Sequence, residues 1–292
     1  MFKGAITAIV TPFTERGSLD EESLRKLVEF QIKNNIDGIV PCGTTGESPT
    51  LDHEEHGRVI EIVIDAAKGK VPVIAGAGSN STRHAIEMTR QAADLGADAS
   101  LHVPPYYNKP TQEGIYRHFS EIAKAVDLPI MAYNIQGRTA VNIETSTLAR
   151  LAKEYSNIVG VKEASGNVAQ MMDVITELPK NFAVISGDDN LTLPLMALGG
   201  KGVISVASNI IPKEMHELCE HALKGDFEKA RKMHYELLPL FKGIFIETNP
   251  IPIKAALAMR GMIKESYRLP MCEMKAENKE KLRQILRNLK IV

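Results

Sequence analysis

The chain has 292 residues, of which 44% are hydrophobic and 24% are charged, and its formal net charge is −1. This length allows one large domain, or a domain with an appendage, to bury a substantial core. The balanced charge gives no electrostatic support for nucleic-acid or membrane-surface binding, and no apolar run is long enough to span a membrane. Three cysteines without metal-type spacing leave an odd thiol, so we expect a reducing, cytoplasmic location.

Short apolar runs alternate with amphipathic stretches up to Ser205, at a period of roughly thirty residues. Most runs are rich in Val, Ile and Ala rather than alternating, as buried parallel strands are. The expected strands are Gly4–Thr11, Asp37–Pro41, Val71–Ala77, Ala99–Val103, Pro129–Asn134, Ile158–Glu163, Ala183–Gly187 and Gly202–Ser205. These units predict a (β/α)8 TIM barrel. An open, doubly wound sheet is the alternative, but no Gly-x-Gly-x-x-Gly follows the first strand to bind a dinucleotide.

Two helix starts are marked by polar residues ahead of an apolar series. Ser18 and Glu21 have the spacing of a capping box before Leu24, which predicts that a helix begins there. Ser81 is expected to begin a later helix that runs toward Leu95.

From about Pro212 to the last residue, the sequence has only helical periodicity. The expected helices are Pro212–Leu223, Asp226–Phe241, Pro250–Met262 and Glu277–Leu289. We therefore expect a catalytic barrel over residues 1–224 and a small C-terminal helical domain over residues 225–292. No Pro/Ser-rich linker separates them, so the helices should pack on the barrel.

A loop with two glycines directly follows the second expected strand. Gly43 and Gly46 bracket Thr44 and Thr45, so the backbone can turn sharply and point its amides at an anion. The hydroxyls can relay protons or donate to a carboxylate, which suits a small oxoacid. The loop lacks the length and the lysine of a phosphate-binding P-loop. A plain strand-to-helix turn is the alternative.

Two tyrosines and an arginine follow the next strands. Tyr107 comes after the fourth strand and Tyr133 ends the fifth, and a phenol in such a place can pass a proton to a hydroxyl neighbour. Aromatic residues at a barrel rim are also common packing residues. Arg138 follows Tyr133 closely and can bind a carboxylate with both arms of its guanidinium, the alternative being a surface arginine.

Lys162 stands at the end of the short apolar run Ile158–Glu163, where α/β barrels place their chemistry. Burial lowers the pKa of an amine because it disfavours the ammonium form, and the free amine can then condense with a ketone. Lys162 is therefore a candidate Schiff-base nucleophile. The alternative is a lysine that caps the strand and pairs with Glu163.

His53 and His56 share one face of an expected helix, which raises the question of a metal site. Their spacing differs from the His-Glu-x-x-His of zinc proteases, and the sequence offers no clear third ligand. We expect a solvated helix start and no metal.

Taken together, these motifs resemble the dihydrodipicolinate synthase family of the pyruvate-dependent class I aldolase superfamily. The resemblance covers essentially the whole chain in the same order. The matching segments are Gly43-Thr44-Thr45-Gly46-Glu47, Tyr106-Tyr107-Asn108-Lys109-Pro110, Tyr133-Asn134 with Arg138-Thr139, Gly160-Val161-Lys162-Glu163 and Glu247-Thr248-Asn249-Pro250.

The resemblance implies a role for each matching residue. Lys162 would form the Schiff base with pyruvate, while Thr44, Tyr133 and Tyr107 would make a proton relay, with Tyr107 supplied by a neighbouring subunit. Thr44 and Thr45 would hold the pyruvate carboxylate. The remaining assignments are Arg138 at the carboxylate of the second substrate, and Gly187 and Ile204 lining the surroundings of the lysine.

The implied reaction is the condensation of pyruvate with L-aspartate 4-semialdehyde, giving hydroxytetrahydrodipicolinate on the route to lysine and diaminopimelate. No cofactor or metal is expected, and the family suggests a homotetramer made of two tight dimers. Two departures concern substrate choice: Gln136 stands where many members have proline, and Pro104 stands where threonine is usual. A 2-keto-3-deoxy sugar-acid aldolase is the alternative enzyme, and a barrel that binds metabolites without turnover is the alternative outside catalysis.

In feedback-inhibited members of the family, L-lysine binds between subunits. The matching positions here are Ser48, His53, His56, Asn80 and Tyr106. His84 stands where those members commonly have glutamate, and a carboxylate is the better partner for a lysine ammonium. We therefore expect weak inhibition by lysine.

Overall fold

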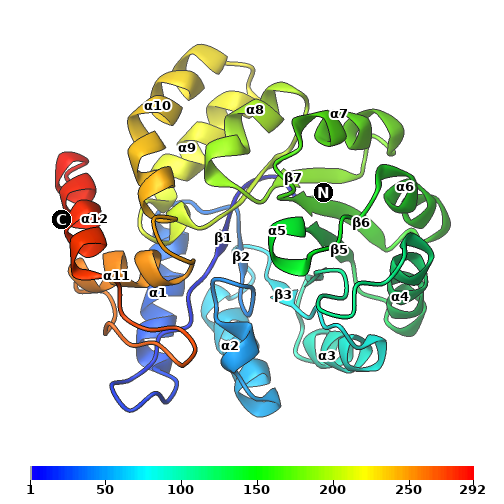
Figure 1. The fold of residues 1–292 in the computed structure, drawn as a ribbon, viewed down its shortest axis with the longest axis horizontal. Helices are drawn as coiled ribbons and strands as arrows, with labels where there is room; N and C mark the ends of the chain where they lie inside the picture. Colours follow the sequence, from blue (N-terminus) through cyan, green and yellow to red (C-terminus); the bar gives the residue numbers. More distant parts are fainter. Residues whose placement is uncertain (1) are drawn as a thin grey trace.

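The structure is a computed structural model that describes residues 2–292. Its centre is a sheet of eight parallel strands within these residues, surrounded by helices (Figure 1). The strands follow one another around the sheet in the order β2-β1-β8-β7-β6-β5-β4-β3. Their bounds are β1 (Gly4–Ala8), β2 (Gly38–Val40), β3 (Ile74–Gly76), β4 (Ala99–His102), β5 (Ile130–Asn134), β6 (Ile158–Glu163), β7 (Ala183–Ser186) and β8 (Gly202–Ser205).

The sheet closes on itself between β2 and β3. Ile39 forms a parallel bridge with Val73, and the Ile39 N–H donates to the Pro72 carbonyl at 3.0 Å. The Gly76 N–H donates to the Pro41 carbonyl at the same distance, 3.0 Å. The predicted TIM barrel is confirmed, and the alternative of an open, doubly wound sheet is wrong.

Every expected strand is present, but several are shorter than their apolar runs. The apolar run Gly4–Thr11 is longer than the strand β1, because Ile9 and Val10 are buried in a loop that follows the strand. There the Val10 N–H donates to Asn209 Oδ1 at 3.0 Å instead of to a neighbouring strand. A side-chain amide thus replaces the ladder partner, which hydrophobicity alone does not reveal.

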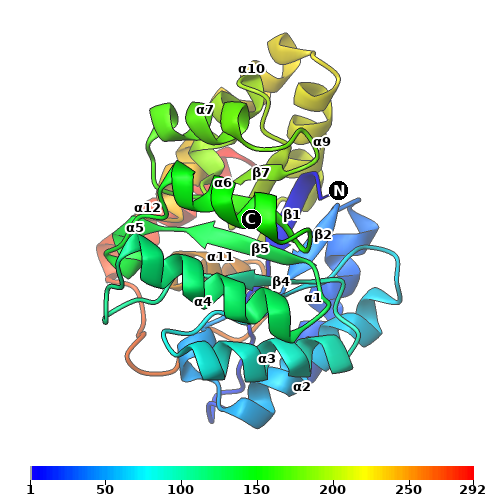
Figure 2. The same cartoon turned by 90° about the vertical axis from the view of Figure 1, so that its right-hand side faces the viewer.

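Helices cover the outer face of the barrel, and Figure 2 shows α3, α4 and α6 packed side by side there. Ser81 caps α3 as predicted. The cap predicted at Ser18 is wrong, because Leu19 bridges to Phe13 and Asp20 caps α1 instead. The barrel helices are α1 (Glu21–Lys33), α2 (His53–Ala67), α3 (Thr82–Asp94), α4 (Gln112–Ala125), α5 (Gln136–Thr139), α6 (Thr145–Glu154), α7 (Val168–Glu177), α8 (Thr192–Ala197) and α9 (Pro212–Leu223).

A C-terminal helical part follows the barrel, as expected, with α10 (Phe227–Gly243), α11 (Ile251–Met259) and α12 (Ala276–Asn288). These helices lie at one side of the barrel next to α1 and α9 (Figure 1). Ile253 and Leu257 of α11 share one hydrophobic core with Leu24 of α1 and Val59 of α2. The helices therefore pack firmly on the barrel, and the division at residues 1–224 and 225–292 stays a prediction. Over residues 2–292, no helix is long and apolar enough to cross a membrane.

Candidate active site

Lys162 is the last residue but one of β6, and it lies between Tyr133 on β5 and Ile185 on β7 in the strand register. Its Nζ lies 4.0 Å from the centroid of the Tyr133 ring. Neighbouring side chains on a strand point to opposite faces, so Glu163 turns away from Lys162. Its carboxylate accepts from the Ser165 N–H at 2.8 Å and from Asn134 Nδ2 at 3.2 Å. The alternative in which Lys162 pairs with Glu163 is wrong.

The environment of Lys162 shifts its protonation equilibrium towards the free amine. The residue is 5% exposed, and burial lowers the pKa of its ammonium group to about 8, although the charges of Asp188 and Asp189 oppose this and that of Arg138 adds to it. Desolvation disfavours the charged form, as the sequence argument required. A larger share of the amine is therefore neutral at pH 7 than in an exposed lysine.

Tyr133 lies beside this amine, and Thr44 lines the same cavity as Tyr133. Burial raises the pKa of the Tyr133 phenol, and Asp188 adds to the effect, while Arg138 and the nearby Thr44 side chain oppose it. The phenol therefore keeps its proton at neutral pH and can pass it on. Thr44 comes from the loop after β2, so three different segments bring Lys162, Tyr133 and Thr44 to one place.

The loop that carries Thr44 is a tight turn with internal hydrogen bonds. The Gly46 N–H donates to the Gly43 carbonyl at 3.1 Å, and the Glu47 N–H donates to the Thr44 carbonyl at 3.2 Å. Thr45 is 2% exposed, and its hydroxyl oxygen accepts from Asn249 Nδ2 at 3.0 Å. The loop is thus fixed from within and also by a residue from near the C-terminal helices.

Asn249 also contacts Arg138, which lies on the short helix α5. Arg138 Nη2 donates to the Asn249 carbonyl at 3.1 Å. One residue therefore joins Thr45 and Arg138, the two groups that the resemblance assigns to different carboxylates. The segment Glu247-Thr248-Asn249-Pro250 belongs to the family resemblance, but no role for Asn249 could be predicted from the sequence. Only the fold brings this residue next to the loop.

Gly187 directly follows β7 and lies against the lysine side chain. A Cβ atom at this position would lie 3.1 Å from Lys162 Cε and 2.5 Å from Ala164 Cβ. Ile204, on β8, is fully buried and belongs to the same interior cluster as Tyr133. Both residues border the barrel interior into which Lys162 extends.

Asp188 and Asp189, which sequence reasoning missed, follow Gly187. Burial raises the pKa of Asp188 to about 6, although Lys162 opposes this. Asp189 is 1% exposed and accepts from Ser205 Oγ at 2.5 Å and from the Ala207 N–H at 3.0 Å. Acidic residues directly after an expected strand were the signal that could have revealed them.

A cavity of about 710 Å³ opens beside the site and is lined by Thr44, Tyr133 and Arg138. It also reaches most of the predicted lysine-binding residues, namely Ser48, His53, His56, His84 and Tyr106. His56 is 3% exposed, and burial lowers the pKa of its imidazole to about 4, so it is neutral at pH 7. Asn80 does not line this cavity, and its carbonyl accepts from Asn108 Nδ2 at 2.9 Å.

Tyr107 is the catalytic candidate that the single chain does not bring to the others. Its side chain is 90% exposed and does not line the cavity. Its φ of 70° lies in the left-handed region, which is uncommon for a residue with a bulky side chain. No group of three or more His, Cys, Asp or Glu side chains within residues 2–292 is arranged to hold a metal ion.

The fold and site define a (β/α)8 barrel with a buried amine at the carboxyl end of one strand, as in barrel enzymes that act through a lysine. The model of the dihydrodipicolinate synthetase family matches residues 1–289, and the chain belongs to this family. The 4-hydroxy-tetrahydrodipicolinate synthase of Hydrogenobaculum sp. (strain Y04AAS1) is 54% identical to the chain over 292 residues, which are 100% of both proteins.

Two solved structures extend this comparison. The chloride-inhibited dihydrodipicolinate synthase from Acinetobacter baumannii, complexed with pyruvate, is 47% identical, with a TM-score of 0.98 over 100% of both chains. The enzyme from Cyanidioschyzon merolae with lysine bound is 45% identical, with a TM-score of 0.97 over 100% of this chain and 99% of the other.

Proposed function

We propose that this protein condenses pyruvate with L-aspartate 4-semialdehyde to form 4-hydroxy-tetrahydrodipicolinate, through an imine on Lys162. The observation that carries the proposal is the buried Lys162 amine, whose pKa is lowered to about 8 beside the Tyr133 phenol. The pyruvate bound to the Acinetobacter baumannii relative supports pyruvate as the first substrate.

In the first step, the free amine of Lys162 attacks the ketone of pyruvate, and water leaves as the imine forms. The protonated imine withdraws electrons, so the pyruvate methyl group loses a proton and an enamine results. The enamine carbon attacks the aldehyde carbon of the semialdehyde. The amine of that substrate then displaces Lys162 by transimination, closes the ring and frees the enzyme.

The proton transfers are assigned to Thr44, Tyr133 and a partner subunit's copy of Tyr107. Support comes from the neutral phenol of Tyr133 and from Thr44, which lines the same cavity. A relay needs groups that donate and accept in turn, and hydroxyls do both. The exposed Tyr107 is consistent with a residue that acts in another subunit, within a homotetramer built as a dimer of dimers.

Two positions hold the carboxylates in this proposal. Thr44 and Thr45 hold that of pyruvate, with Gly187 and Ile204 shaping the space around Lys162, and Arg138 holds that of the semialdehyde. A guanidinium binds a carboxylate through two parallel hydrogen bonds, and Arg138 lines the cavity close to Tyr133.

Lysine as an effector belongs to the same proposal. The lysine bound to the Cyanidioschyzon merolae relative and the cavity lining of Ser48, His53, His56 and Tyr106 support such a site, to which Asn80 and His84 would also belong. A cytoplasmic location is proposed as well, because Cys42, Cys219 and Cys272 are all free thiols.

Aldehyde preference tests the proposed function. The purified protein is supplied with pyruvate and, in parallel, with L-aspartate 4-semialdehyde or with the aldehydes used by 2-keto-3-deoxy sugar-acid aldolases. We expect kcat/KM for the semialdehyde to exceed that for each sugar aldehyde by about a hundredfold or more. Preference for a sugar aldehyde would contradict the proposed substrate, and absence of turnover with any aldehyde would contradict the reaction.

A further inference from the structure

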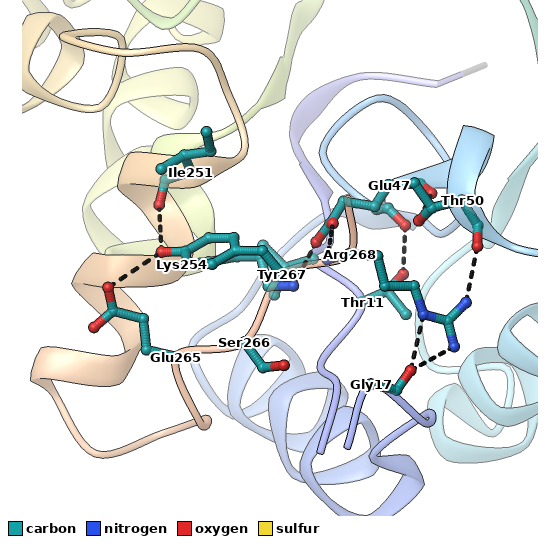
Figure 3. A network of polar contacts seen from close by, with 12 residues as sticks. Thr11, Gly17, Glu47, Thr50, Ile251, Lys254, Glu265, Ser266, Tyr267 and Arg268 are labelled. Carbon is teal, nitrogen blue, oxygen red and sulfur yellow. Dashed lines mark hydrogen bonds and ion pairs between the residues drawn. The ribbon is translucent and has the colours of Figure 1, made fainter. Parts of the chain in front are cut away.

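Lys254 and Glu47 form an ion pair that is almost completely removed from solvent. The side chain of Lys254, in α11, is 0% exposed and that of Glu47 is 1% exposed. The Lys254 amine also lies 4.4 Å from the centroid of the Phe13 ring and 5.4 Å from that of Tyr267. Figure 3 shows the pair within its network of polar contacts. Burying two charges is costly, so a buried pair gives weak support for stability alone and suggests another role.

Glu47 lies in the same turn as Thr44 and Thr45. Its N–H donates to the Thr44 carbonyl at 3.2 Å, and its own carbonyl accepts from the Thr50 N–H at 2.9 Å. Its φ of 52° lies in the left-handed region, where a residue other than glycine persists only if its surroundings hold it. A shift of the Glu47 side chain would therefore be passed to Thr44 through the backbone.

The segment after α11 holds the same turn from a second side. The N–H of Arg268 lies 3.4 Å from the second Glu47 carboxylate oxygen. Its guanidinium donates to both oxygens of Glu55 at 2.6 Å and to the Thr50 carbonyl at 2.8 Å. Figure 3 shows Arg268 lying between Glu47 and the carbonyls of Gly17 and Thr50.

We propose that Lys254 is a positioning residue for the pyruvate site, whose ion pair with Glu47 holds the turn Gly43–Ser48 so that the Thr44 hydroxyl stays against Tyr133. The inference rests on the proposed function, because Thr44 and Thr45 meet pyruvate there. Lys254 does not touch the reacting atoms and acts through Glu47. The competing explanation is that the pair only anchors α11 to the barrel.

The test compares Lys254→Met with a control in the same helix region. Arg260, which ends α11, donates to the Ile210 carbonyl at 2.7 Å and anchors the helix to the barrel without contacting the turn. In Lys254→Met we expect kcat/KM for pyruvate to fall at least about tenfold, mainly through KM, while KM for the semialdehyde changes less than about twofold. Arg260→Met should lower the melting temperature and leave both KM values within about twofold.

Glu47→Gln decides the question if Lys254→Met does not fold, because it keeps the size of the side chain and removes the charge. It should also raise KM for pyruvate selectively, by about threefold or more. All kinetics are measured well below the melting temperature of each variant. An unchanged KM for pyruvate in the folded variants, or an equal rise for both substrates, would overturn the role of Lys254.

The unchanged protein is assayed in parallel. This assay distinguishes a failure of the proposed function from a failure of the positioning role of Lys254. Turnover in the unchanged protein together with an unaltered KM for pyruvate in the variants would overturn only the positioning role. No turnover in the unchanged protein would overturn the proposed function and this inference with it.

Discussion

Lys162 is the proposed nucleophile. Burial lowers the pKa of its amine, and the direction of this shift predicts how the rate should depend on pH. Only the free amine attacks pyruvate, so the rate of imine formation should rise with pH by about tenfold per unit below the pKa of about 8 and level off above it. The measurement is the rate of borohydride trapping with pyruvate between pH 6 and about pH 10. A midpoint of the pH profile near the pKa of an ordinary lysine would show that burial does not lower the pKa of Lys162.

Asp188→Asn provides the matched control for this pH profile. The Asp188 carboxylate raises the pKa of Lys162, so its removal should move the midpoint of the profile below about 8. An upward shift would show that another group sets the lysine pKa.

Gly187 leaves the space that the Lys162 side chain occupies, so a larger residue at this position should reduce activity. In Gly187→Ala the added carbon would lie 3.1 Å from Lys162 Cε and 2.5 Å from Ala164 Cβ, so the lysine side chain or its neighbour must move. We expect kcat/KM for pyruvate to fall by about tenfold to a hundredfold. Gly137→Ala is the control, because a Cβ there meets nothing within 4 Å. Equal effects of the two substitutions would refute the packing argument.

At the level of elements, the sequence was sufficient for features that depend on local patterns. The run Ile158–Glu163 forms β6 over the expected residues, and the helix Pro212–Leu223 was also predicted with its observed bounds. The start of α1 was not predicted correctly, because the bridge between Phe13 and Leu19 fixes the backbone around Ser18. Competition from a contact outside the helix is invisible to a capping pattern.

In the candidate site, too, residues marked by local patterns were predicted, and residues placed by contacts between distant segments were missed. Lys162, Tyr133 and Thr44 were predicted from strand ends, which a barrel gathers at one face. Asn249 and Lys254 were missed because their contacts with Thr45 and Glu47 join residues more than 200 positions apart, with separations of 204 and 207. Such contacts come from the packing of α11 and of the residues just before it on the barrel, and the apolar character of that helix gives no sign of the turn it touches.

His84 lies on α3 and lines the cavity, so a substitution there should change the affinity for lysine. His84 is exposed, and it stands where a carboxylate would face the ammonium of a bound lysine. We expect weak inhibition of the unchanged protein and inhibition about five- to hundredfold stronger in His84→Glu, corresponding to roughly 1–3 kcal/mol. Lysine titrations of both proteins at fixed substrate concentrations measure this. Potent inhibition of the unchanged protein, or no gain in the variant, would show that His84 does not decide the affinity.

At the scale of the whole molecule, Tyr107 links catalysis to assembly. A single chain leaves this side chain 90% exposed, whereas the proposed relay needs it next to Tyr133 of another subunit. Mixing Tyr107→Phe subunits with Lys162→Ala subunits should therefore give hybrids whose activity departs from simple dilution. The hybrids are compared with mixtures of each variant and the unchanged protein. Activities that follow dilution in every mixture would place Tyr107 outside the partner's site.

The proposed mechanism depends on the buried amine at the end of β6, and covalent trapping with pyruvate tests this dependence directly. The protein is incubated with pyruvate, reduced with borohydride, digested and mapped by mass spectrometry, alongside Lys162→Arg, which keeps its charge but cannot form the imine under these conditions. We predict one pyruvate adduct per chain, on Lys162, and none in the variant. An adduct on another lysine, or no adduct in the unchanged protein, would contradict the proposed mechanism.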